Sequence, residues 1–130
     1  MDKLLSGRRV LVVEDEMLVL MMIEMMLEDL GCEAVVVASS LETALARVAE
    51  QGFDIAMLDM NLGGAESHLV ADALDARKVP YLFCTGNASG DRRDHPRERL
   101  VLRKPFQFDI LAKALAGLLA EHDGLLLTPH

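Results

Sequence analysis

The stretch Phe53-Asp54-Ile55-Ala56-Met57-Leu58-Asp59-Met60-Asn61-Leu62 decides the fold class of this chain. Its apolar run from Ile55 to Leu58 is short and continuous, which suits a strand buried on both faces of a parallel sheet. The run ends at an acid, Asp59. In an open sheet of parallel strands the functional site lies at the carboxyl ends of the strands, so Asp59 lies where chemistry is expected. A lone acid after a strand is more often a solvated turn residue or a helix cap, so the other strand ends decide its role.

The composition indicates one globular domain that binds neither nucleic acid nor a membrane. The chain has 130 residues, 52% of them hydrophobic, which is enough for one core with helices on both faces of a sheet. The net charge of -8 argues against nucleic acid or an anionic membrane surface, because both require a cationic partner. Cys32 and Cys84 lie far apart without zinc-binding spacing, which indicates core thiols in a reducing cytosol. With no signal peptide or membrane span expected, we predict a soluble, cytoplasmic protein.

Strand and helix patterns alternate along the chain, with short links between them. Strands are expected at 10–13, 33–37, 55–58, 81–85 and 100–103. Helices are expected at 17–30, from a capping box at Ser39 and Glu42 to about residue 51, at 66–77, and from about residue 110 until Asp123-Gly124 ends the last one. Their inward faces are expected to include Leu69 and Ile110. This alternation is typical of a doubly wound parallel sheet. The stretch 86–99 is polar and contains Gly86, Gly90 and Pro96, so it predicts a short or frayed fourth helix.

The first expected helix carries more apolar residues than one buried face needs. A stripe of Val19, Met22, Ile23, Met26, Leu27 and Leu30 has the spacing of a core-facing surface. The apolar residues outside that stripe are Met17, Leu18, Leu20, Met21 and Met25. One interpretation is that a wide stripe packs most of them against neighbouring elements. The other is a docking surface for a protein, because flexible methionine side chains suit adaptable contacts.

Reactive side chains follow four of the expected strands. Glu14 and Asp15 follow the first, Asp59 the third, Thr85 ends the fourth, and Lys104 follows the fifth. The carboxyl ends of parallel strands meet at one edge, where three carboxylates repel each other and a divalent cation such as Mg²⁺ relieves the repulsion. A lysine and a threonine hydroxyl at the same edge can contact phosphoryl oxygens. An aspartate that attacks a phosphoryl group needs little more than a metal, a cation and in-line positioning.

These motifs resemble the receiver domain of two-component response regulators, over residues 8 to about 121. The matching segments are Val10-Leu11-Val12-Val13-Glu14-Asp15-Glu16, Asp54 to Leu62, Thr85-Gly86 and Lys104-Pro105-Phe106. The resemblance implies a flavodoxin-like fold with a five-stranded parallel sheet of strand order 2-1-3-4-5. It also implies that Asp59 accepts a phosphoryl group from a histidine kinase.

The resemblance further assigns the residues around that acceptor. It implies that Mg²⁺ is bound by Glu14, Asp15, Asp59 and the backbone carbonyl of Asn61. The phosphoryl group would be contacted by Thr85, by Lys104 and by the backbone of Gly86. The peptide bond between Lys104 and Pro105 would be cis. Apart from the resemblance, the surplus apolar residues of the first helix would serve docking to the kinase, through Met17, Leu20 and Met21.

Two features depart from the usual receiver pattern. Val101 occupies the place of the switching aromatic residue three positions before the lysine, so the coupling of Thr85 to an aromatic ring is in doubt. Asn61-Leu62-Gly63-Gly64 replaces the usual Met-Pro after the acceptor strand. The segment Pro80-Tyr81-Leu82-Phe83-Cys84-Thr85-Gly86 is similar to the Pro-Phe-x-Phe-Ala-Thr-Gly signature of an atypical receiver subgroup. That subgroup tends to work with kinases of the HWE type.

The sequence therefore predicts one receiver domain over residues 1–130 without an output domain, and a monomer. A phosphate shuttle, a phosphate sink and a target-binding switch are equally compatible with it. A rival is a phosphohydrolase that uses Asp59, but Asn61 cannot serve as its general acid. A second rival is a receiver-like binding module that acts without phosphorylation, which the substitution at Val101 keeps open.

Overall fold

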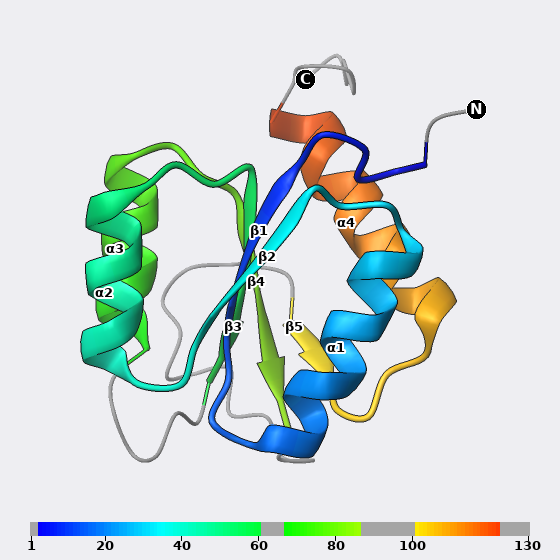
Figure 1. The fold of residues 1–130 in the computed structure, drawn as a ribbon, viewed down its shortest axis with the longest axis horizontal. Coiled ribbons are helices and arrows are strands. Elements are labelled where there is room, and N and C mark those ends of the chain that lie inside the picture. Colours follow the sequence, from blue (N-terminus) through cyan, green and yellow to red (C-terminus); the bar gives the residue numbers. More distant parts are fainter. Residues whose placement is uncertain (1–2, 61–66, 87–100, 123–130) are drawn as a thin grey trace.

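The sheet contains five parallel strands in the order β2-β1-β3-β4-β5, which confirms the predicted flavodoxin-like topology. This computed structural model describes residues 3–60, 67–86 and 101–122 (Figure 1). The strands are β1 (Arg9–Val13), β2 (Ala34–Ala38), β3 (Ile55–Asp59), β4 (Tyr81–Thr85) and β5 (Val101–Arg103). The helices in the described residues are α1 (Met17–Asp29), α2 (Leu41–Glu50), α3 (His68–Ala76) and α4 (Phe108–His122).

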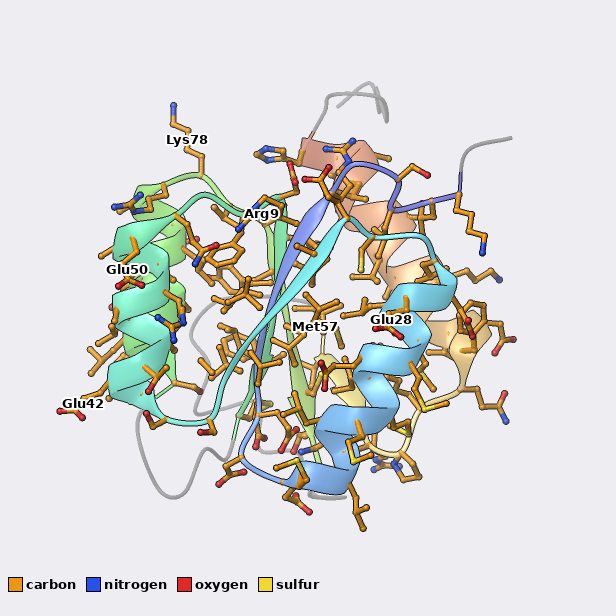
Figure 2. All side chains as sticks on the ribbon, in the orientation of Figure 1. Arg9, Glu28, Glu42, Glu50, Met57 and Lys78 are labelled. Atoms are coloured by element: carbon orange, nitrogen blue, oxygen red, sulfur yellow. The ribbon has the colours of Figure 1, made fainter. Side chains whose placement is uncertain are left out.

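Helices cover both faces of the sheet and bury its central strands. Figure 1 shows α1 and α4 on one side of the sheet and α2 and α3 on the other. Every residue of β3 and β4 is buried, because both faces of these strands are covered. Alternate residues of β3 therefore enter different cores. Met57 packs in the core beneath α1 and α4, and Leu58 packs in the core beneath α2 and α3 (Figure 2 labels Met57).

The packing of α1 corrects one predicted docking residue. Leu20 was assigned to the surplus apolar residues, but it is buried in the core with Ile23 and Leu27. The spacing of three and four residues between them places all three on one helical face. The predicted stripe was centred about 60° away from the buried face. The first seven residues of α1 are all apolar, so the sequence does not define the centre of that face. Met17 and Met21 are exposed, in agreement with the docking interpretation.

Two residues expected on inward helix faces lie outside. Leu69 in α3 and Ile110 in α4 are exposed, although both helices were expected to point them at the core. In α3 the buried face is formed instead by Val70, Ala71 and Leu74. Leu69 and Ile110 lie in the first turn of their helices, each directly before a buried residue of the inward face, Val70 in α3 and Leu111 in α4. The predicted short fourth helix falls in residues 87–100, which lie outside the described residues.

The N-cap of α2 is Ser40, not the predicted Ser39. The Ser40 hydroxyl accepts a hydrogen bond of 3.1 Å from the backbone N–H of Thr43, whereas Ser39 is an exposed residue of the preceding loop. The predicted capping box with Glu42 is therefore wrong, because strand β2 extends through Ala38 and delays the start of the helix by one residue.

Replacement of Ser40 by alanine is expected to lower the free energy of unfolding by about 1 kcal/mol, since the N–H of Thr43 loses its acceptor. The matched control is Ser39→Ala, which should change it by less than about 0.5 kcal/mol. Urea unfolding at pH 7 measures both. Equal losses in the two variants would contradict the assignment of the cap.

None of the described helices is long and apolar enough to span a membrane.

Candidate functional site

The polar strand ends lie together at the carboxyl edge of the sheet. β1 pairs with β3, β3 with β4 and β4 with β5, so the ends of these four strands are neighbours. Asp59 is in register with Cys84, and Thr85 with Arg103, the residue before Lys104. The order of the strands therefore brings residues that are up to 90 positions apart in the sequence, such as Glu14 and Lys104, into contact.

Three carboxylates form the centre of this site. Oxygen atoms of Glu14, Asp15 and Asp59 all lie within 4.8 Å of one another. Glu14 and Asp59 are buried, with 1% and 2% of their surface exposed, whereas Asp15 is exposed. Burial follows from their positions, because Asp59 is the last residue of the covered strand β3 and Glu14 directly follows β1. Asp15 leaves the cluster accessible from solvent.

Lys104 supplies the positive charge that these acids require. Its Nζ lies 2.9 Å from Oε1 of Glu14 and 3.4 Å from Oδ1 of Asp59, and its side chain is only 8% exposed. Burial by itself lowers the pKa of Lys104, but the hydrogen bond to Glu14 and the charges of Asp59 and Glu14 outweigh this effect. The net result is a raised pKa, so the lysine remains charged at neutral pH.

Glu16 is a residue of this site that the sequence reasoning did not assign. Its carboxylate Oε1 lies 3.8 Å from Nζ of Lys104, while its backbone N–H donates a 3.0 Å hydrogen bond to Oε2 of Glu14. The signal available in the sequence was the run of three acids after β1, of which only the first two were given a role. Glu16 also precedes α1 as its N-cap residue, without a side-chain cap bond.

The chain around Lys104 is held against β4. The backbone N–H of Lys104 donates a 2.6 Å hydrogen bond to the carbonyl of Thr85, and the Lys104–Pro105 peptide bond is cis, as the resemblance implied. Thr85 is buried at the end of β4. A Cβ atom at Gly86 would lie 3.8 Å from Cε of Lys104, so this glycine is a close neighbour of the lysine side chain.

Val101 packs against the core beneath α2 and α3. It is half-buried and in register with Phe83 of β4. Phe83 itself forms an edge-to-face contact with Tyr81, with ring centroids 5.7 Å apart. An aromatic ring thus borders the position of Val101, but it is supplied by β4 and not by β5.

The donor set fits a hard divalent cation. Carboxylate oxygens are the ligands that Mg²⁺ prefers, and three of them meet here with one side open to solvent. Asn61, whose carbonyl the resemblance assigns as a further ligand, lies outside the described residues. Cys84 adjoins the site but is no ligand of this type, since burial above all raises the pKa of its thiol to about 12.

Comparison with known proteins agrees with this arrangement. The family model described as "Response regulator receiver domain" matches residues 10–116. The chain belongs to the response regulator receiver domain family. Receiver domains are signalling domains of two-component systems, so the predicted class of protein is confirmed. No curated protein matches the sequence significantly.

Several solved receiver structures resemble this one. SdrG from Sphingomonas melonis Fr1 is 46% identical, with a TM-score of 0.77 over 87% of this chain and 97% of that chain. The BeF3-activated conformation of SdrG from Pseudomonas melonis Fr1 is 48% identical, with a TM-score of 0.73 over 88% and 98%. The receiver domain of the sensor histidine kinase PA1611 from Pseudomonas aeruginosa PAO1 is 25% identical, with a TM-score of 0.78 over 88% and 99%. That structure has a magnesium ion coordinated in its active-site cleft.

Proposed function

We propose that this receiver domain accepts a phosphoryl group on Asp59 from the phosphohistidine of a histidine kinase, with Mg²⁺ as cofactor. The observation that carries the proposal is the contact of buried Asp59 with Lys104 beside two further carboxylates. A buried carboxylate beside an ammonium group is positioned to act as a nucleophile. After phosphorylation the ammonium group would still pair with the negatively charged phosphoryl group.

The residues of the site have complementary roles in this reaction. A carboxylate oxygen of Asp59 forms the new bond to phosphorus, while the bond from phosphorus to the donor nitrogen breaks and its electron pair stays with the imidazole. Lys104 pairs with a phosphoryl oxygen, and the hydroxyl of Thr85 and the N–H of Gly86 donate hydrogen bonds to the others. Bound Mg²⁺, held by Glu14, Asp15, Asp59 and the carbonyl of Asn61, would neutralise the charge that gathers between the acids and the phosphoryl group.

Intact mass after incubation with acetyl phosphate tests this chemistry on the unmodified chain. We expect a gain of one phosphoryl group, about 80 daltons, in the presence of Mg²⁺ and not after chelation with EDTA. A gain that persists in EDTA would contradict the metal requirement. Failure of both acetyl phosphate and a panel of histidine kinases to produce the adduct would contradict the phosphoacceptor function and favour a binding module that acts without phosphorylation.

The exposed apolar residues beside the site suit contact with the kinase. Met17 directly follows Glu16, and Met21 lies about one turn further along α1, with 67% and 51% of their surfaces exposed. Because Leu20 is buried, the docking assignment is limited to these two of the three predicted residues. The flexible thioethers can adapt to a helical partner surface.

Met21→Glu is expected to slow phosphotransfer from a histidine kinase about tenfold, because a carboxylate replaces an apolar contact at the interface. Phosphorylation by acetyl phosphate should remain unchanged, since the substitution does not touch the carboxylates. Leu69→Glu is the matched control, because Leu69 is an exposed apolar residue of α3, which covers the other face of the sheet. Equal loss with kinase and with acetyl phosphate would count against docking.

A further inference from the structure

The ammonium group of Lys104 contacts three acids, of which only two are buried. Its Nζ lies 2.9 Å from Oε1 of Glu14, 3.4 Å from Oδ1 of Asp59 and 3.8 Å from Oε1 of Glu16. Glu14 and Asp59 are buried, whereas the Glu16 side chain is 68% exposed. Lys104 therefore has two inner partners, to which Mg²⁺ is also assigned, and one outer partner that lies outside the assigned ligand set.

Binding of Mg²⁺ would bring a second cation to carboxylates that already have one. Both oxygens of Glu14 accept hydrogen bonds in the structure: Oε1 from Lys104 at 2.9 Å, and Oε2 from the backbone N–H of Glu16 at 3.0 Å. A divalent ion and an ammonium group that share Glu14 and Asp59 repel each other, because both are positive and lie against the same oxygens. The affinity for Mg²⁺ therefore depends on which other acid can hold the ammonium group.

Glu16 combines a fixed backbone with a carboxylate that no helix cap holds. Its backbone N–H donates to Glu14, and its carbonyl accepts a 2.9 Å hydrogen bond from the N–H of Leu20. Its side chain, in contrast, forms no cap hydrogen bond with α1. The carboxylate can thus move closer to Lys104 by rotation about its own side-chain bonds, while the backbone stays in place beside the site.

We propose that Glu16 is a positioning residue that takes over the ammonium group of Lys104 when Mg²⁺ binds the buried carboxylates. This role rests on the proposed function, since it requires that Glu14 and Asp59 hold the ion. Glu16 acts through the lysine and not as a ligand, because its carboxylate draws the ammonium group outward and so lowers the repulsion between the two cations. Lys104 stays at the edge of the site, where it can pair with an incoming phosphoryl oxygen.

Glu16→Gln is expected to weaken Mg²⁺ binding about three- to fivefold, the size of effect that an ion pair with an exposed partner supports. The midpoint of urea unfolding in EDTA should stay that of wild type, because without the ion the inner acids hold Lys104 and the contact with Glu16 is long, at 3.8 Å. Mg²⁺ titrations followed by backbone amide shifts in NMR give the dissociation constants. The matched control is Glu28→Gln, which removes the same charge from an exposed position in the last turn of α1 (Figure 2) and should change neither quantity.

A double-mutant cycle with Lys104→Met separates an effect through the lysine from a direct attraction of the ion by Glu16. When no ammonium group remains to be moved, Glu16→Gln should change the Mg²⁺ affinity by less than about twofold. An undiminished loss in that background would overturn the proposal. Glu16→Asp provides the same distinction should the double variant not fold, because it keeps the charge but shortens the side chain by one methylene group. It should weaken Mg²⁺ binding as Glu16→Gln does, and wild-type affinity in Glu16→Asp would overturn the proposal.

The same titrations distinguish the role of Glu16 from the function on which it rests. If wild type and Glu16→Gln bind Mg²⁺ equally well, only the role of Glu16 is overturned. If wild type itself does not bind Mg²⁺, the metal assignment of the proposed function fails together with this role. A lower urea midpoint of Glu16→Gln in EDTA, with unchanged Mg²⁺ affinity, would show that Glu16 merely stabilises the fold and would overturn the proposal.

Discussion

Replacement of Asp59 by asparagine is expected to abolish the phosphoryl adduct that acetyl phosphate and Mg²⁺ produce on the wild-type chain. The amide nitrogen and oxygen of asparagine occupy the space of the carboxylate, but the neutral amide is a far weaker nucleophile. The substitution also removes the charge of one of the three carboxylates whose oxygens lie within 4.8 Å of one another, so the affinity for Mg²⁺ should fall. Intact mass measures the first effect, and the Mg²⁺-dependent rise in melting temperature measures the second.

The fold should survive this substitution, because it removes a charge from a crowded acidic cluster. Relief of repulsion with Glu14 and Asp15 offsets the weakened contact with Lys104 at 3.4 Å. The matched control is Asp29→Asn, a change of the same kind at an exposed position at the end of α1. An adduct that persists in Asp59→Asn would place the acceptor elsewhere. If the affinity for a partner protein changes neither on phosphorylation nor in Asp59→Asn, the chain is a binding module that acts without phosphorylation.

Lys104→Met is expected to lower the free energy of unfolding by about 3 kcal/mol at pH 7 in the absence of divalent cations. Methionine has a similar length but no charge, so Glu14 and Asp59 remain buried without the ammonium group that contacts both. The control is Lys113→Met in α4, an exposed lysine whose loss should cost less than about 0.5 kcal/mol. Urea unfolding in EDTA measures both variants.

Magnesium should partly rescue Lys104→Met, because a divalent cation can replace the missing charge. The increase in unfolding free energy on adding Mg²⁺ should therefore be larger in the variant than in wild type. If Lys104→Met is as stable as wild type in EDTA, Lys104 does not offset the negative charge of the buried acids. An equal response to Mg²⁺ in both proteins would show that the lysine and the metal do not share these carboxylates.

The contribution of Lys104 to stability should also depend on pH. Its pKa in the folded protein is raised above the ordinary value of 10.5, so the folded state holds the proton more tightly than the unfolded state. The stabilisation is complete below pH 10.5 and is lost as the pH rises through the folded pKa. The stability difference between wild type and Lys104→Met should accordingly shrink above pH 10.5, which urea unfolding at a series of pH values measures.

The sequence by itself determined the fold class and most of the site. The apolar run that ends at Asp59, and the alternation of strands and helices, predicted a parallel sheet, because a strand buried on both faces has no polar alternation. In such a sheet the strand ends share one edge, so Glu14, Asp59, Thr85 and Lys104 could be grouped without coordinates. The strand 81–85 was predicted with the bounds that the structure shows.

The tertiary structure decided the features that depend on contacts between elements, such as the rotation of a helix and the residue at which it begins. The buried face of α1 includes Leu20 because contact with the sheet and α4, and not the helix's own nearly uniform apolar sequence, sets its rotation. The helix α2 begins after Ser40 because pairing with β1 extends β2 through Ala38. The place of Glu16 beside Lys104 was decided in the same way. The two residues are far apart in sequence. They meet because the β1 and β5 ends lie at the same edge of the sheet, where the Lys104 side chain comes within 3.8 Å of an exposed acid.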